Sequence, residues 1–300
     1  MSTSLETPAA TPAAEQRAGS LFVLTFSCPE RLGLVHSLTG VLVRHAGDIV
    51  ELKQFDDAVT ARFFFRAEFR LAGSVAPPEL RDDLAALADE LGAEWALTPK
   101  GQKRRILLMV SKFGHCLNDL LFRERTGDLN AEIVAVVSNH PDFRQTVEWH
   151  GIPFFRIPVT KDTKPEAEAK LLELVERFEV DLVVLARYMQ VLSDNLCHEL
   201  SGRAINIHHS FLPSFKGAKP YHQAYARGVK TVGATAHYVN DELDEGPIIA
   251  QQVQPVDHSF GPEDLVAAGR DTECKALADA VRWHCDGRVF LNGARTVVLA

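Results

Sequence analysis

The sequence predicts an α/β protein in which a small N-terminal α+β sandwich precedes a Rossmann-like, doubly wound domain. Its 300 residues exceed the usual size of one domain, so two domains are expected. Three short strand-like runs and two helical stretches occupy the first third, whereas continuous apolar runs separated by helical stretches follow from Arg105. Continuous apolar runs are typical of parallel strands that are buried on both faces. The larger sheet is therefore expected in the second domain.

The N-terminal domain is expected over residues 20–97, after a tail at 1–19 that is rich in Ala, Thr, Pro and Glu and should be disordered. Apolar residues at helical spacing predict its two helices. The expected elements are a strand at 21–26, a helix at 30–45, strands at 49–55 and 62–69, and a helix at 77–91. This βαββα… order is typical of a small α+β sandwich.

A basic linker is expected at 98–104 and the second domain at 105–300. We interpret the linker's lysines and arginines as a solvated hinge. Strands are expected at 106–110, 133–137, 182–185, 204–208 and 233–239, with helices around Leu117 to Leu121, at 143–149 and at 166–178. Alternating strands and helices predict a doubly wound sheet, in which ligands bind at the carboxyl ends of the strands.

Composition excludes several classes of function. A net charge of −8 and a pI near 5.8 argue against nucleic-acid binding, which needs a basic surface. No apolar run approaches the ~20 residues that span a bilayer, and the N-terminus lacks the apolar core of a signal peptide. Five cysteines without a CxxC pair argue against a disulfide framework and a thiolate zinc site. We expect a cytoplasmic protein that binds neither nucleic acid nor a membrane.

Three polar residues form the candidate catalytic group. Asn206 and His208 are two residues apart on one expected strand and so share a face, and Asp244 lies in an acidic loop after the next strand. An amide donor can stabilise the oxyanion that forms when a carbonyl group is attacked. A histidine can exchange a proton near neutral pH, and a carboxylate can accept a proton from water or orient that histidine.

Two other interpretations of this group stay open at this point. Asn206 could cap a turn while His208 packs in a core. A metal could instead be held by histidines, although their spacing fits no compact zinc motif. The candidate histidine ligands are His208, His209, His222 and His237.

Residues 206–213, Asn-Ile-His-His-Ser-Phe-Leu-Pro, resemble the NIHxSxLP motif of the enzymes that use formyltetrahydrofolate, and residues 243–247 resemble their LDxGP motif. The resemblance extends over nearly all of residues 104–300. It implies catalytic roles for Asn206, His208 and Asp244, a folate substrate, and no cofactor or metal. It also implies a folate pocket with two walls, one made by Met189, Gln190, Val191 and Leu192 and the other by Val239 and Asn240.

Residues 28–35, Cys-Pro-Glu-Arg-Leu-Gly-Leu-Val, resemble the first loop and helix start of ACT regulatory domains, over about residues 20–97. This resemblance implies edge-to-edge pairing, hence a homo-oligomer such as a dimer or tetramer. It also implies an amino-acid effector, glycine or methionine, near Arg31, Gly33 and Leu34. Alternatively, Gly33 only permits tight helix packing and the domain only dimerises.

The formyl acceptor is expected to be water. The loop at 111–119 has one glycine between Phe113 and His115, whose bulk hinders a backbone cradle for the phosphate of a ribonucleotide acceptor. The stretch after Asp244 is short for a basic tRNA-binding domain. Further motifs resemble the formyltetrahydrofolate deformylase family, namely the ACT-like domain, 138–140, 219–224 and 268–271.

This second resemblance implies hydrolysis of 10-formyltetrahydrofolate to formate and tetrahydrofolate, which would supply formate and balance the one-carbon pool for purine synthesis. Three alternatives remain: a formyltransferase that acts on a small amine, a non-catalytic folate or amino-acid sensor, and a metal-dependent hydrolase.

Overall fold

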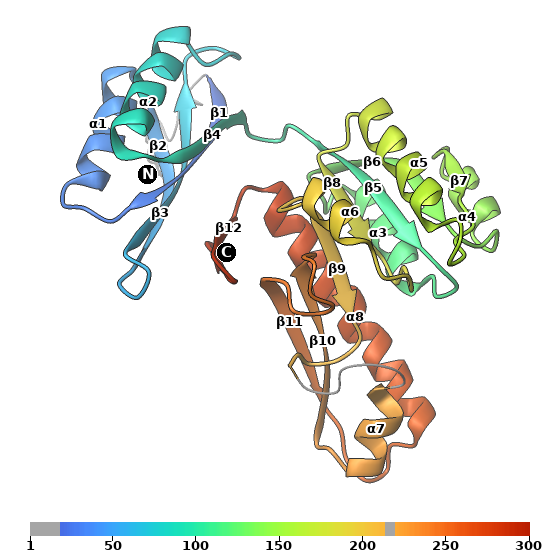
Figure 1. Cartoon of the computed structure of the whole chain (residues 1–300). Coiled ribbons are helices and arrows are strands. Elements are labelled where there is room, and N and C mark those ends of the chain that lie inside the picture. Colours follow the sequence, from blue (N-terminus) through green and yellow to red (C-terminus); the bar gives the residue numbers. More distant parts are fainter. Residues whose placement is uncertain (1–18, 214–219) are drawn as a thin grey trace, which may run out of the picture. The chain divides into compact units, whose positions relative to one another are not determined.

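The computed structural model describes residues 19–213 and 220–300, and Figure 1 traces them in chain order. The chain divides into two compact units. The first contains residues up to Lys53 together with Phe65–Lys100, and the second contains Gln54–Phe64 and Gly101–Ala300. All but the last residue of the predicted N-terminal tail lies outside the described residues. Each unit is treated by itself below.

The N-terminal elements follow the order βαββαβ. They are β1 (Ser20–Pro29), α1 (Leu34–Arg44), β2 (Asp48–Asp57), β3 (Arg62–Leu71), α2 (Pro78–Leu91) and β4 (Glu94–Pro99). The strands form one sheet in the order β2-β3-β1-β4, and the two helices contact each other. The sequence predicts the first five elements. It misses β4, which pairs antiparallel with β1, because Leu97 is its single buried residue.

Helix α1 begins four residues later than the predicted start at residue 30. Gly33 precedes the helix with φ 88°, a left-handed conformation that glycine adopts without a steric penalty. Arg31 and Leu32 therefore lie in the loop before the helix, and the Leu32 side chain is fully exposed. Helical spacing alone predicts that Leu32 lies on the apolar face of this helix. This prediction is wrong, because the helix begins at Leu34.

The second unit contains nine strands and six helices among its described residues from Gly101 onward. They are β5 (Arg104–Val110), α3 (His115–Thr126), β6 (Ala131–Ser138), α4 (Arg144–Trp149), β7 (Phe154–Arg156), α5 (Lys164–Arg177), β8 (Leu182–Leu185), α6 (Asp194–Glu199), β9 (Ala204–His208), α7 (Pro220–Arg227), β10 (Thr231–Tyr238), β11 (Ile248–Pro255), α8 (Pro262–Cys285), β12 (Val289–Asn292) and β13 (Arg295–Val298). Seven strands form one sheet in the order β11-β10-β9-β8-β5-β6-β7, and β12 pairs with β13.

The large sheet is mixed, which refines the predicted doubly wound sheet. Strands β5 to β9 pair in parallel, whereas β10 is antiparallel to both β9 and β11. The connection from β10 to β11 is the loop at 239–247, and a loop of that length makes a hairpin, whereas a parallel crossover needs a dozen or more residues. The expectation of continuous apolar, parallel strands is confirmed for β5, β6 and β8.

Alternate residues of the central strand β5 enter two hydrophobic cores. Ile106, Leu108 and Val110 pack with α3, α4 and α8 on one face of the sheet, and Leu107 and Met109 pack with α5 and α6 on the other. Because side chains alternate along a strand, an apolar residue at every position of β5 requires helices on both faces. This burial explains the continuous apolar runs.

The strand order reverses between β5 and β8, since β6 and β7 lie to one side of β5 and β8 and β9 to the other. The carboxyl ends of β5 and β8 therefore flank the switch point at which open α/β sheets bind ligands. The backbone N–H of Ser111 donates to the Arg187 carbonyl across this point, at 3.2 Å.

Helix α8, which the sequence analysis does not predict, packs against β9, β10, β11, α3 and α7. Its buried face includes Gly269, Thr272, Glu273 and Asp279, which interrupt the apolar period that helix prediction relies on. In the described part of the chain we find no helix whose length and apolarity would let it cross a membrane.

Two neighbouring residues of α3 provide a test of the packing. Leu121 is buried in the core, whereas Phe122 is 54% exposed. We expect Leu121→Ala to lower the free energy of unfolding by about 3 kcal/mol, through lost transfer energy and the cavity left behind. We expect Phe122→Ala, the control on the same helix, to change it by less than about 0.5 kcal/mol. Urea unfolding measures both, and equal losses would contradict this packing.

Candidate active site

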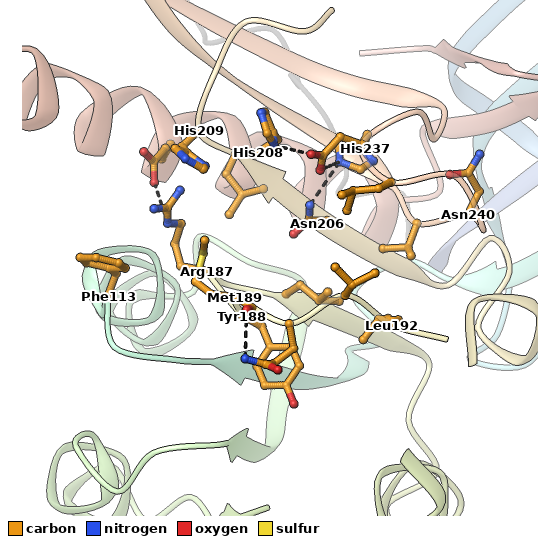
Figure 2. Close-up of a pocket in the computed structure, with 18 of the residues that line it drawn as sticks. Phe113, Arg187, Tyr188, Met189, Leu192, Asn206, His208, His209, His237 and Asn240 are labelled. Carbon is orange, nitrogen blue, oxygen red and sulfur yellow. Dashed lines mark hydrogen bonds and ion pairs between the residues drawn. The ribbon is translucent and has the colours of Figure 1, made fainter. Parts of the chain in front are cut away.

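The structure brings the three predicted catalytic residues together in one pocket (Figure 2). Asn206 and His208 extend from β9, and Asp244 comes from the β10–β11 loop. His208 Nδ1 lies 3.1 Å from Asp244 Oδ2, and both side chains are largely buried. The prediction that Asn206 and His208 share a face of one strand agrees with this geometry.

The contact with Asp244 determines which nitrogen of His208 faces the pocket. In neutral imidazole one ring nitrogen donates and the other accepts. Because Nδ1 lies against a carboxylate, it carries the proton, and the lone pair is on Nε2. His208 Nε2 is buried and has no hydrogen-bond partner among residues 19–213 and 220–300. An unpartnered ring nitrogen in a pocket wall is suited to proton exchange with a bound molecule.

His237, on β10, orients the amide of Asn206. The two residues are directly opposite in the β9–β10 ladder, and Asn206 Nδ2 lies 3.2 Å from His237 Nε2. His237 Nδ1 lies 2.8 Å from the Tyr238 carbonyl and must donate to it, so Nε2 accepts from Asn206. One N–H of the amide is therefore held by His237 and the other is left for a ligand.

The Asp244 loop lies very close to β10. A side chain at Gly246 would collide with the backbone carbonyl of Tyr238, so only glycine fits there. The Tyr238 N–H donates to the Pro247 carbonyl at 2.9 Å. Asp244 itself has φ 60°, a left-handed conformation that aspartate tolerates better than most residues. The Gly-Pro end of the Leu-Asp-Glu-Gly-Pro segment thus holds Asp244 against His208.

Thr235 anchors the start of the loop that follows β9. Its hydroxyl donates to the Ser210 carbonyl at 2.9 Å and accepts from the Leu212 N–H at 3.0 Å. Gln251 Nε2 donates to the Leu212 carbonyl at 3.0 Å. These bonds fix the backbone immediately after His208 and His209. The remainder of the loop, at 214–219, lies outside the described residues, as does Lys219 of the predicted 219–224 motif.

Burial and charge keep the carboxylate ionised and two histidines neutral. Burial raises the pKa of Asp244, but the hydrogen bond and positive charge of His208 outweigh it and hold this pKa below its ordinary value. Burial lowers the pKa of His237. Burial, together with the charges of Arg187 and His208, lowers the pKa of His209 to about 4. Asp244 is therefore a strong hydrogen-bond acceptor and a weak base.

The pocket has a volume of about 550 Å³, within the range of small-molecule sites. All six residues predicted for the folate pocket line it, namely Met189, Gln190, Val191, Leu192, Val239 and Asn240. Met189 and Val191 are half exposed and supply apolar surface. Asn240 Oδ1 is buried and, in the described part of the chain, has no hydrogen-bond donor. Figure 2 shows Leu192 and Asn240 at the opposite end of the pocket from Phe113.

Ser111 fixes the segment that carries Met189 to Leu192. Its hydroxyl donates to Asn139 Oδ1 at 2.8 Å and accepts from the Met189 N–H at 3.0 Å. Ser111 follows β5, Asn139 follows β6 and Met189 follows β8, so three strand ends are tied together at the switch point. This contact gives the Ser138-Asn139-His140 motif a structural role that its sequence alone does not reveal.

A buried charged cluster forms the end of the pocket near His209, and the sequence analysis does not predict it. Glu273 of α8 accepts hydrogen bonds from His115 Nε2 at 2.7 Å and from the Tyr221 hydroxyl at 2.8 Å. Arg187 Nε lies 3.4 Å from Glu273 Oε2. A side chain at Gly269 would collide with the Tyr221 ring, so the Ala-Gly-Arg-Asp motif at 268–271 makes room for Tyr221.

The same cluster contains the one group of potential metal ligands found among the described residues. Ligand atoms of His115, Cys116 and Glu273 lie within 4.8 Å of one another. The Glu273 carboxylate already has two hydrogen-bond donors and a guanidinium, so a metal ion would have to displace them. Among the described residues, the four histidines that the sequence suggested as metal ligands form no such group; they are His208, His209, His222 and His237.

The predicted effector residues lie at the start of α1 in the first unit. Gly33 is the residue before the helix, and Leu34 is buried as its first residue. Arg31 NH2 lies 2.6 Å from Glu90 Oε1 of α2, and both side chains are at least half exposed. A carboxylate ligand of Arg31 would compete with Glu90.

The low pKa of His209 predicts acid sensitivity. The unfolded chain binds this proton near pH 6.5, whereas the folded chain binds it near pH 4. Between about pH 4 and 6.5 the unfolded state therefore binds more protons than the folded state. The free energy of unfolding consequently falls as the pH drops from about 6.5 to 4. Between pH 7 and 5 we expect the free energy of unfolding of the unaltered chain to fall by about 2 kcal/mol more than that of His209→Gln, as measured by urea unfolding. The exposed His198→Gln is the control, and equal losses in all three proteins would refute the shift.

A family model for formyl transferases matches residues 104–281. A formyltetrahydrofolate deformylase from Corynebacterium sp. (strain P-1) is 65% identical over 280 residues, covering 92% of this chain and 97% of that relative. The crystal structure of the formyltetrahydrofolate deformylase from Burkholderia mallei ATCC 23344 matches this chain with a TM-score of 0.90 and 52% sequence identity. The match covers 94% of this chain and 100% of the Burkholderia chain. The crystal structure of the formyltetrahydrofolate deformylase from Pseudomonas putida KT2440 matches with a TM-score of 0.89 and 52% sequence identity, over 93% of this chain and 100% of the Pseudomonas chain. The chain therefore belongs to the formyl transferase family and, within it, to the formyltetrahydrofolate deformylases.

Proposed function

We propose that this chain hydrolyses 10-formyltetrahydrofolate to formate and tetrahydrofolate. The observation that carries the proposal is the joint placement of a free amide N–H on Asn206 and an unpartnered, carboxylate-bound imidazole on His208 in one pocket. A formamide needs a donor for its oxygen and a group that can move a proton. Membership in the deformylase family supports the same reaction.

In the first step, water attacks the formyl carbon and transfers a proton to His208 Nε2. The carbonyl oxygen becomes an oxyanion, which accepts a hydrogen bond from the Asn206 N–H that His237 does not hold. A preorganised donor of this kind is worth about 10²–10³ in rate. Asp244 stabilises the imidazolium through Nδ1.

In the second step, the bond from the formyl carbon to N10 of the folate breaks. The imidazolium returns its proton from Nε2 to N10, which leaves as a secondary amine, and formic acid ionises to formate. The sequence allowed Asp244 to act either as a base or as an orienting group. Its lowered pKa and its contact with Nδ1 favour orientation and charge stabilisation, and leave the base role to His208.

The folate is expected to place its pterin ring between the two predicted walls. Met189 and Val191 supply apolar surface for a flat ring, and the unpartnered Asn240 Oδ1 can accept from an amino or ring N–H group. The side chains supply every group that these steps need, so we expect no cofactor or metal.

Formate release tests the proposal most directly. Purified protein given 10-formyltetrahydrofolate without an acceptor, and with a chelator, should release formate and tetrahydrofolate in equal amounts. We expect Asp244→Asn to lower turnover by about 10³-fold or more, because the amide cannot stabilise the imidazolium, while folate binding is retained.

Glu245→Gln, one residue along the same loop and outside the pocket lining, is the matched control and should keep near-normal turnover. Near-normal turnover of Asp244→Asn would remove Asp244 from the mechanism. Loss of activity with chelator would favour metal-dependent hydrolysis. Tight folate binding without formate release would favour the transferase or sensor alternatives.

We also propose that the first unit is an ACT domain that binds glycine or methionine and pairs with another copy into a homo-oligomer. Its βαββαβ order, the strand order β2-β3-β1-β4 and the Cys28–Val35 motif support this assignment. The loop before α1 places Arg31 beside helix-start amides, a favourable setting for a carboxylate. Control of hydrolysis by an amino acid fits a role in balancing the one-carbon pool for purine synthesis.

Arg31→Ala tests the effector proposal. We expect formate release without effector to stay unchanged. The concentration of glycine or methionine that gives half of the response should rise by at least about tenfold, because a charge-assisted hydrogen bond is lost. The control Glu90→Gln removes the competing partner of Arg31 and should strengthen the response. An unchanged response in Arg31→Ala would exclude Arg31 from the site.

A further inference from the structure

Arg187 lies in the pocket wall in an unfavourable setting. It follows β8 with φ 65°, a left-handed conformation that is uncommon for a long side chain. Its guanidinium is buried; NH1 has no hydrogen-bond partner within the described residues, and Nε has only the Glu273 carboxylate, 3.4 Å away and outside hydrogen-bond geometry. Buried donors without acceptors destabilise a fold, and strain of this kind persists mainly at functional sites. Arg187 therefore calls for a functional explanation.

The position of Arg187 indicates what it does. Figure 2 shows Phe113, Arg187 and His209 at one end of the pocket, Asn206 and His208 in the middle, and Leu192 and Asn240 at the other end. If the folate occupies the Leu192 end and its formyl group reaches Asn206, a second substrate must enter through the Arg187 end. That end is lined by Phe113, His115, Arg187, Tyr221 and Glu273.

The Phe113 ring lies 5.4 Å from the Arg187 guanidinium and packs against it. Gly114, the next residue of the loop that carries Phe113, lies against the Phe143 ring without room for a side chain. The ring and the guanidinium together therefore occupy part of the space through which a second substrate would enter.

Electrostatics also disfavour an amine at this end. An amine acceptor arrives as an ammonium ion and needs a carboxylate to hold it and a base to take its proton. Glu273 is the buried carboxylate at this end, and His115, Tyr221 and Arg187 already surround it. The Arg187 guanidinium occupies the cationic position that an ammonium group would take.

We propose that Arg187 determines acceptor specificity by occupying the amine-acceptor end of the pocket, so that only water reaches the formyl group. This inference rests on the proposed function, and it assigns to Arg187, with Phe113 over it, the distinction between hydrolysis and formyl transfer. Removing Arg187 vacates the position beside Glu273 Oε2, where an ammonium group can take the place of the guanidinium while His115 and Tyr221 keep their hydrogen bonds. The ammonium group first releases one proton to solvent. The amine nitrogen then attacks the formyl carbon while His208 Nε2 takes its second proton, the bond to N10 breaks, and His208 returns that proton to N10.

The test compares products rather than rates. Arg187→Gly should fold, because glycine adopts φ 65° without strain. Given 10-formyltetrahydrofolate and glycinamide, we expect the unaltered chain to yield formate alone. The Arg187→Gly chain should yield N-formylglycinamide as well, at a ratio to formate that rises with the glycinamide concentration. Formate release by the unaltered chain without glycinamide tests the proposed function separately.

Three controls sharpen the comparison. Arg187→Lys keeps a cation beside Glu273 and should yield formate alone. Glu179→Gly introduces glycine at another position with positive φ, exposed and far from the pocket lining, and should also yield formate alone. Free guanidinium ion should refill the space in Arg187→Gly and suppress formation of the amide.

Formate as the sole product of an active Arg187→Gly chain would overturn the proposal. So would loss of hydrolysis without amide formation in a folded Arg187→Gly chain, because Arg187 would then act on water or on the folate. If Arg187→Gly does not fold, Phe113→Ala decides the matter. It opens the same end by removing a half-exposed ring, and formate alone from this variant would overturn the proposal.

Discussion

The contact between His208 Nδ1 and Asp244 Oδ2 is the interaction on which the rest of the site depends. It determines that Nε2 is the free nitrogen of His208, it lowers the pKa of Asp244, and it joins two segments that are far apart in sequence. The fold supports this contact from both sides. Strand β9 holds the histidine in the sheet, and the tight approach of Gly246 to Tyr238 brings the aspartate to it.

The two antiparallel strands at one end of the sheet matter for the same reason. Pairing of β9 with β10 puts His237 opposite Asn206 and Thr235 opposite His208. His237 then holds one N–H of the amide, and Thr235 holds the backbone after the histidine. A purely parallel sheet would carry an α/β crossover here and would not offer these cross-strand partners. The mixed sheet is thus part of how the site is organised.

Hydrolysis and formyl transfer both need an oxyanion donor and a proton-transfer group at the formyl carbon. The difference between the two reactions must therefore come from the other residues of the pocket. In this chain the residues predicted for the folate pocket lie on one side of the Asn206, His208 and Asp244 group, and the buried Arg187–Glu273 pair lies on the other. Phe113 and His115, whose bulk is expected from the sequence to hinder a phosphate cradle, both line this pocket.

The sequence by itself determined the properties that depend on neighbouring residues. Continuous apolar runs predicted β5, β6 and β8, and period-two geometry placed Asn206 and His208 on one face. The family resemblance selected Asp244 and six further residues that line the same pocket. The sequence missed β4 and α8, where single buried residues or buried polar groups obscure the pattern.

Only the tertiary structure decided the cross-strand partner of Asn206, the free nitrogen of His208, and the Arg187 contact with Glu273. These depend on strand register and on packing between segments distant in sequence, which local periodicity does not encode.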